Sequence, residues 1–170
     1  METLSHDERV ALARLRALIE LLPTALDRQL SSAGVTSFEF TLLEALHSAE
    51  RGRLRLTALA SRTNATLPRL SRVVTGLERK GLVVRAACEE DGRATNAVLT
   101  EAGEAAYLHT RPVYEGAVRD MVLSNLDEES VGQLAAISFS VLSALDPERR
   151  LAVTEDGDQA SCAADPPLQR

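Results

Sequence analysis

Two arginines three residues apart, Arg69 and Arg72, are the side chains in this sequence best placed to do chemistry. Residues at this spacing lie on one side of a helix. Arginine is the commonest bidentate reader of guanine, and Ser or Thr hydroxyls bond bases or phosphates. The residues that surround the pair are Thr66, Pro68 and Ser71. The segment therefore predicts contacts with bases in the DNA major groove, the alternative being a pair of solvated arginines.

Basic charge is concentrated around this segment. The chain has a net charge of −6, yet residues 51–93 hold ten basic and four acidic residues, which leaves −12 for the remainder. A basic module in an acidic frame is typical of a protein that meets DNA phosphates through one face. Within the module, Arg62 and Arg85 are further candidates for contacts with the phosphate backbone.

A short helix, a turn and a second helix are predicted to position the two arginines. The first helix covers residues 58–63, and Asn64 follows as a residue that tolerates left-handed geometry. Thr66 can cap the second helix, and Gly81 ends it. This order is that of a helix-turn-helix, in which the second helix enters the major groove.

A hairpin is predicted next, with strands at residues 82–85 and 95–99. Asp91 and Gly92 supply a turn signal between them. Arg93 then lies at the hairpin tip, where an arginine can enter a narrow A·T-rich minor groove. Asp91 is expected to support this wing by pinning Arg93 or capping the turn. The sequence thus predicts a winged helix-turn-helix, a mainly α fold with a small β-hairpin wing.

Long helices with apolar stripes flank this module on both sides. The first begins at a capping box of Ser5 and Glu8 and is expected to kink or split at Pro23. In the last helix, Val131, Leu134, Ile137, Val141, Leu142 and Leu145 are expected to point inward. Because one chain offers these terminal helices no partner large enough, we expect a homodimer joined through them.

The predicted organisation has four parts. Residues 1–35 form an N-terminal dimerisation helix, and residues 36–100 form the DNA-binding domain. Residues 101–146 form C-terminal dimerisation helices, with a bend at Pro112. Residues 147–170 are polar and acidic and predict a disordered tail.

The wing and the second helix resemble those of the multiple antibiotic resistance regulator (MarR) family. Asp91, Arg93 and, after five residues, Leu99 and Thr100 resemble its Asp-x-Arg-x5-Leu-Thr signature. Residues 70–83 are similar to its recognition helix and the exit from it. The resemblance implies a dimeric transcriptional regulator, usually a repressor, on a palindromic operator. It also implies an effector, often phenolic or anionic, bound between the dimer helices and the DNA lobe.

Four polar or aromatic residues on the predicted helices are candidates to line such an effector cleft: Arg16, His47, Tyr107 and His109. A surface or core role is the alternative for each. The chain has no Trp and no cysteine near the start of its first helix. The resemblance therefore does not extend to the urate-binding and peroxide-sensing members of the family.

Other classes of function find little support in the sequence. Three scattered histidines and dispersed glycines give no metal, nucleophile or phosphate-loop spacing, so we expect no enzyme, metal or cofactor. Cys88 and Cys162 do not form a disulfide framework and are expected as free thiols, with redox sensing as the alternative. No apolar run reaches membrane-spanning length, and no secretory signal opens the chain, which favours the cytoplasm.

Two alternatives to a repressor remain open at this point. One is a helical dimer that has lost operator binding and acts as an adaptor for a protein partner or a ligand. The other is a transcriptional activator, which would use the same DNA-reading helix.

Overall fold

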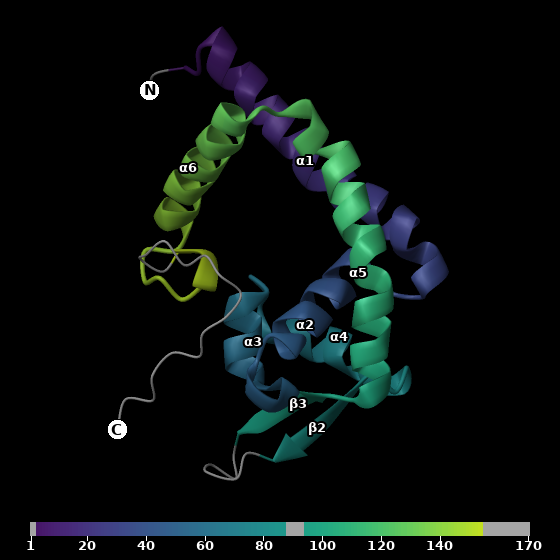
Figure 1. Ribbon diagram of the computed structural model, residues 1–170. Helices are drawn as coiled ribbons and strands as arrows, with labels where there is room; N and C mark the ends of the chain where they lie inside the picture. Colours follow the sequence, from purple (N-terminus) through teal and green to yellow (C-terminus); the bar gives the residue numbers. More distant parts are fainter. Residues whose placement is uncertain (1–2, 88–93, 155–170) are drawn as a thin grey trace.

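Six α-helices and a three-stranded sheet make up the part of the chain that the structure describes, residues 3–87 and 94–154 (Figure 1). The structure is a computed structural model. Its helices and strands are α1 (His6–Leu30), α2 (Ser37–His47), β1 (Arg53–Arg55), α3 (Leu56–Arg62), α4 (Leu67–Arg79), β2 (Val83–Ala87), β3 (Thr95–Leu99), α5 (Glu101–Met121) and α6 (Glu128–Leu145). The predicted mainly α fold with a small wing is confirmed.

The sheet has the order β1-β3-β2, and both pairings are antiparallel. Val98 on the central strand β3 faces Arg53 of β1 on one side and Val84 of β2 on the other. The two predicted hairpin strands are therefore present, and β1 adds a third. The tip of the hairpin, with Asp91 and Arg93, lies outside the described residues.

The buried core surrounds α2. Phe40, Leu43 and Leu46 of this helix are fully buried, and α2 contacts α1, α3, α5 and β3. From the other side, α4 contributes a stripe of fully buried residues at the helical spacing, namely Leu70, Val74 and Leu77. This stripe seats α4 on the core and leaves its opposite face to solvent.

Local signals in the sequence set several helix ends. Both capping boxes are present, Ser5 with Glu8 at α1 and Thr36 with Glu39 at α2. Thr66 occupies the N-cap position of α4, but its side chain makes no capping hydrogen bond. Pro23 does not split the helix, because α1 runs without interruption from His6 to Leu30, and the alternative of a kink there stays a prediction.

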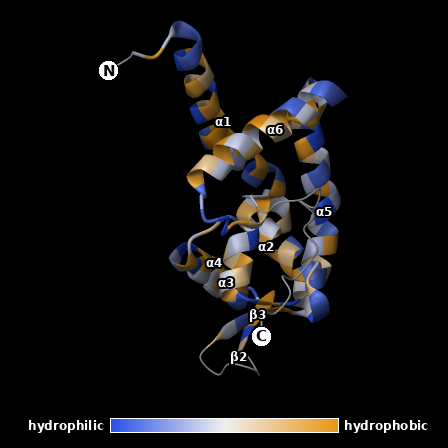
Figure 2. Cartoon of the chain, turned by 90° about the vertical axis from the view of Figure 1, so that its left-hand side faces the viewer, coloured by the Kyte–Doolittle hydropathy of each residue, from blue (hydrophilic) through white to orange (hydrophobic). Residues whose placement is uncertain are grey.

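The apolar stripes of α1 and α6 are largely uncovered (Figure 2). On α1, Leu26 is buried, whereas Leu18 and Ile19 are 59% and 62% exposed. On α6, none of the residues is buried, and Ile137 is 64% exposed. The expectation that the α6 stripe points inward is therefore wrong within one chain. No described helix is long and apolar enough to cross a membrane.

The chain remains folded for nine residues after α6, from Asp146 to Thr154. The Asp146 carboxylate accepts hydrogen bonds from the Thr154 hydroxyl (2.6 Å) and the backbone N–H groups of Arg150 (3.1 Å) and Leu151 (2.8 Å). The Ser61 hydroxyl of α3 donates to the Arg150 carbonyl at 2.6 Å. These bonds tie residues 147–154 to Asp146 and to α3, and the extent of the disordered tail stays a prediction.

Two glycines of α5 give opposite predictions for the same substitution. A Cβ on Gly103 would lie 2.0 Å from the Leu82 carbonyl oxygen and 2.8 Å from a Leu99 methyl carbon. Gly103→Ala should therefore lower the free energy of unfolding by about 3 kcal/mol through overpacking. Gly116, with nothing within 4 Å of an added Cβ, is the matched control. Gly116→Ala should raise that free energy by roughly 0.5–1 kcal/mol, because alanine favours the helix.

Urea denaturation of the two variants measures both effects. Equal stability of the two alanine variants would show that the wing does not pack against the start of α5 as described.

Candidate nucleic-acid interface

The outer face of α4 gathers all five residues that the sequence predicts to meet bases. Each of them is exposed: Thr66, Pro68, Arg69, Ser71 and Arg72. The turn before α4 has the left-handed geometry expected at Asn64, with a φ of 52°. The helix is therefore anchored by its buried stripe and presents a basic, hydroxyl-bearing surface.

Arg69 is held in place by a ring on another helix. Its guanidinium carbon lies 4.1 Å from the centroid of the Phe38 ring in the first turn of α2. Such a cation–π contact contributes about 0.5–1 kcal/mol at an exposed site. The contact restricts the position of the Arg69 guanidinium, and the side chain as a whole stays exposed. Arg72, one turn further along α4, is exposed.

Arg85 of β2 reaches back to α4. Its guanidinium donates to the Ser71 carbonyl (2.9 Å), to the Thr75 hydroxyl (3.2 Å) and to the Glu78 carboxylate, with which it forms an ion pair. The Arg85 backbone N–H also donates to Glu78 at 3.1 Å. These bonds fasten the wing strand to the exposed side of α4.

The other predicted phosphate and wing residues are less closely defined. Arg62 is the last residue of α3 and is half-buried. Asp91 and Arg93 lie outside the described residues, so the proposed minor-groove contact stays a prediction.

Two of the four candidate effector residues meet between α2 and α5. The His47 ring lies 4.5 Å from the ring of Tyr107, and both belong to an aromatic column. Phe40 stacks against Tyr107 at 5.5 Å and against Tyr114 at 4.3 Å. Arg16 is exposed on α1.

His109, the fourth candidate, is exposed two residues beyond Tyr107 on α5 and therefore points to nearly the opposite side of that helix. Beside the column is a surface pocket of about 390 Å³. His47 and Glu104 both line it, with the His47 Nδ1 atom 3.6 Å from a Glu104 carboxylate oxygen.

An ionisable cluster lies further along the same α2–α5 contact. Burial raises the pKa of the Glu44 carboxyl, while Arg111 opposes the shift and Glu115 adds to it. The pKa of Tyr114 is also raised, chiefly by burial and then by the Glu44 charge. Arg111 itself forms an ion pair with Glu115 at 2.6 Å. Folding therefore disfavours the charged form of Glu44 relative to the unfolded chain.

Sequence reasoning missed the contacts that hold this surface together. Phe38 and Glu78 carried no signal of their own, because their partners lie 31 and 7 residues away in the chain. The only available hint was the capping box that begins α2, which fixes Phe38 within a first helical turn.

Comparisons with known proteins agree with this geometry. The model of the MarR family matches residues 33–94. Sco3205, a MarR family transcriptional regulator from Streptomyces coelicolor solved in complex with DNA, is 34% identical, with 86% of this chain and 92% of that chain covered and a TM-score of 0.83. AbsC, a MarR family transcriptional regulator from the same organism, is 28% identical over 86% of this chain and 99% of its own, with a TM-score of 0.82.

A third solved structure is similar over a somewhat shorter stretch. The M. tuberculosis transcriptional regulator MOSR in complex with DNA is 26% identical, with 79% of this chain and 97% of that chain covered and a TM-score of 0.67. The present chain belongs to the MarR family of transcriptional regulators.

The Glu44 environment gives a pH-dependent prediction. A carboxyl whose pKa is raised by folding binds its proton more tightly in the folded state, so its contribution to stability is present at low pH and lost as pH rises through the folded pKa. Glu44→Gln should therefore melt at a higher temperature than the wild type at pH 7. The difference should vanish below about pH 3, where the carboxyl is protonated in both states.

Thermal melts between these two pH values measure the effect, with Glu128→Gln, which changes an exposed carboxyl on α6 outside this cluster, as the control. A Glu44→Gln protein that melts lower than the wild type at pH 7 would mean that attraction to Arg111 outweighs burial.

Proposed function

We propose that this chain binds a pseudo-palindromic DNA duplex as a homodimer and represses transcription there. The exposed face of α4, with Arg69 and Arg72 above a fully buried stripe, is the observation that carries the proposal. Membership of a family of transcriptional regulators supports it, as do the DNA complexes of the related Sco3205 and MOSR proteins. The chain then acts in the cytoplasm as a regulator and not as an enzyme.

Different residues serve different parts of the duplex in this proposal. The bases of the major groove are read by Arg69 and Arg72, with Thr66, Pro68 and Ser71 around them. Arg93 enters the minor groove, with Asp91 supporting the wing. Arg62 and Arg85 position the phosphate backbone, and Arg85 does so from a guanidinium already bonded to α4. Specificity comes from the base contacts, because phosphate contacts are the same for every sequence.

A second copy of the chain covers the apolar faces of α1 and α6 in this proposal. Side chains such as Ile19 and Ile137 are more than half exposed, and the two faces are continuous over several helical turns. Exposed apolar surface of this extent marks an interaction site. A two-fold arrangement also sets the two α4 helices at a fixed separation, as two half-sites require.

An effector is proposed to release the protein from DNA, following the resemblance to other members of the family. Its candidate contacts are His47 and Tyr107, whose rings lie against each other, and Arg16 and His109, whose side chains are exposed. An adaptor without operator binding remains the rival, and ionic strength separates the two. Specific DNA binding weakens steeply with salt through counterion release, whereas binding of an apolar protein partner does not.

Replacing Arg72 by alanine tests the base-reading role. An operator is first selected from a random DNA pool with the full chain. Arg72→Ala should then weaken operator binding by about 1–3 kcal/mol and relax selection at one position of each half-site. The control is Arg119→Ala, which removes the same charge from an exposed position on α5. Anisotropy titrations at two salt concentrations measure the operator affinity of both variants. An unchanged affinity in Arg72→Ala would show that Arg72 does not contact the bases.

The homodimer is tested by placing a charge on the uncovered face. Ile137→Asp should shift the protein from dimer towards monomer, because an unpaired carboxylate cannot be buried between two apolar faces. Sedimentation velocity measures the mass, with Glu129→Gln at the start of α6 as the control. A wild-type protein that sediments as a monomer would contradict the proposed assembly.

A further inference from the structure

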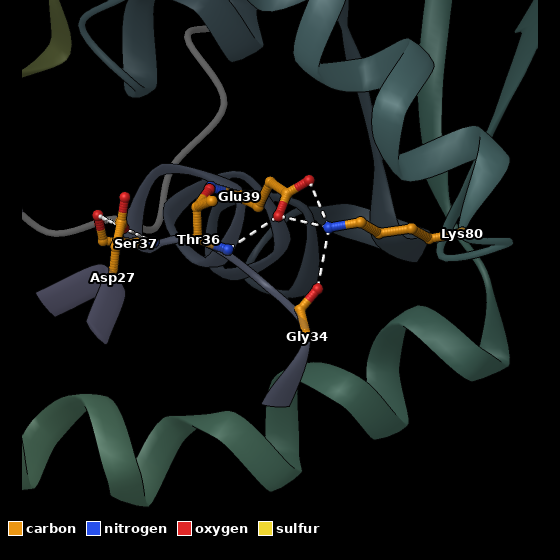
Figure 3. A network of polar contacts seen from close by, with 6 residues as sticks. All are labelled: Asp27, Gly34, Thr36, Ser37, Glu39 and Lys80. Atoms are coloured by element: carbon orange, nitrogen blue, oxygen red, sulfur yellow. Dashed lines mark hydrogen bonds and ion pairs between the residues drawn. The ribbon is translucent and has the colours of Figure 1, made fainter. Parts of the chain in front are cut away.

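Three consecutive residues at the start of α2 contact three different places: α1, the start of α4 and the end of α4. Ser37 is bonded to α1, Phe38 contacts Arg69 near the start of α4, and Glu39 is bonded to Lys80 at the end of α4. We name residues 37–39 the junction turn. The network on both sides of it is drawn in Figure 3.

The Lys80 side of the junction turn uses the full donor capacity of an ammonium group. The Lys80 Nζ atom donates to the Gly34 carbonyl at 2.9 Å and to the two carboxylate oxygens of Glu39 at 2.8 and 2.7 Å. A lysine has three such donors, and all three point at the α1–α2 connection. These three hydrogen bonds tie the C-terminal end of α4 to Gly34 and Glu39.

Glu39 is a partner that cannot easily move away. Its side chain is 11% exposed, and it also accepts the backbone N–H of Thr36 at 2.8 Å as part of the capping box. The Lys80 side chain is 40% exposed, so its removal would leave a largely buried carboxylate without its ion-pair partner, which is destabilising. The ion pair therefore constrains the angle of α4 and is more than a surface contact.

The α1 side of the junction turn is fixed by Asp27. One carboxylate oxygen of Asp27 accepts both the backbone N–H and the hydroxyl of Ser37, each at 2.6 Å. Asp27 lies one turn from the C-terminal end of α1, the helix whose other half carries the uncovered apolar face. Two sets of polar bonds, joined by the backbone of the first turn of α2, thus link the proposed dimer helix α1 to the proposed DNA-reading helix α4.

We propose that Asp27 and Lys80 are positioning residues, which fix the angle of α4 relative to α1 and so set the half-site spacing that the dimer accepts. Adding one base pair between half-sites turns one relative to the other by about 35° and moves it about 3.4 Å. A rigid connection between α1 and α4 prevents binding at the altered half-site spacing, whereas a loosened connection permits it. The inference rests on the proposed function for its DNA consequence, but not for the orientation of the helix.

Distance measurement tests the orientation without DNA. Spin labels are placed on α1 and α4 at Arg14→Cys and Arg72→Cys, with Cys88 and Cys162 replaced by serine and labelled chains diluted with unlabelled chain. Lys80→Met and Asp27→Ala should each broaden the α1–α4 distance distribution. Arg79→Met, which removes a neighbouring exposed charge from the same helix end, should leave it as in the wild type, and Lys80→Arg should restore it.

Operator spacing tests the consequence for DNA, in chains that keep Arg72. Lys80→Met should bind the selected operator about tenfold more weakly, yet lose much less affinity for operators lengthened or shortened by one base pair. Arg79→Met should lower the affinity for operators of every half-site spacing by the same factor. This is the effect of removing one charge from a surface that faces phosphates. Melting temperatures accompany both measurements.

The outcomes separate the two proposals. Distance distributions that stay narrow in both Lys80→Met and Asp27→Ala would overturn the positioning role, whatever DNA does. Broadened distributions in a protein that binds no DNA would retain the positioning of α4 and reject the proposed function instead. Unchanged spacing selectivity in a Lys80→Met protein with a broadened distribution would reject the control of half-site spacing.

Discussion

Burial of α2 is the constraint on which the rest of the structure depends. Phe40, Leu43 and Leu46 have no exposed surface, and α2 packs against α1, α3, α5 and β3. Interiors packed at this density shift only as units, because few voids are available for rearrangement. The stripe of α4 that meets this core therefore holds the basic face of α4 in a fixed orientation. A surface ordered during folding loses less entropy on binding than one that must be ordered by its ligand.

One half of α1 lies in the buried core and the other half is exposed, so the helix connects the core to the exposed apolar face. Its C-terminal part, with Leu26 and Leu30, is buried in the core around α2, while Leu18 and Ile19 two turns earlier are more than half exposed. Because the helix is continuous through Pro23, any partner that covers the exposed half is held at a fixed distance from the buried half. The junction turn then extends this rigidity from α1 to α4.

Local features of the fold could be predicted from the sequence, and long-range ones could not. Capping boxes predicted the starts of α1 and α2, and a turn signal between two strand-like segments predicted β2 and β3, because these signals involve residues close together in the chain. Periodicity showed that α6 has an apolar face but not what covers it, so its burial was predicted wrongly. The bonds of Lys80 to Gly34 and Glu39 span 46 and 41 residues, and no local pattern encodes them.

The basic charge of residues 51–93 exceeds the charge that this face can offer to phosphates. Lys80 is already paired with Glu39 and serves the protein's own geometry, and Arg85 offers a phosphate only the charge that its ion pair with Glu78 leaves. A carboxylate beside a basic group also weakens its attraction for a phosphate, since the two opposite charges largely cancel at distances greater than their separation. The number of counterions released on binding therefore falls below the count of basic residues. Lys80 and Arg85 instead stabilise the position of α4, on which the side chains of Arg69 and Arg72 are exposed.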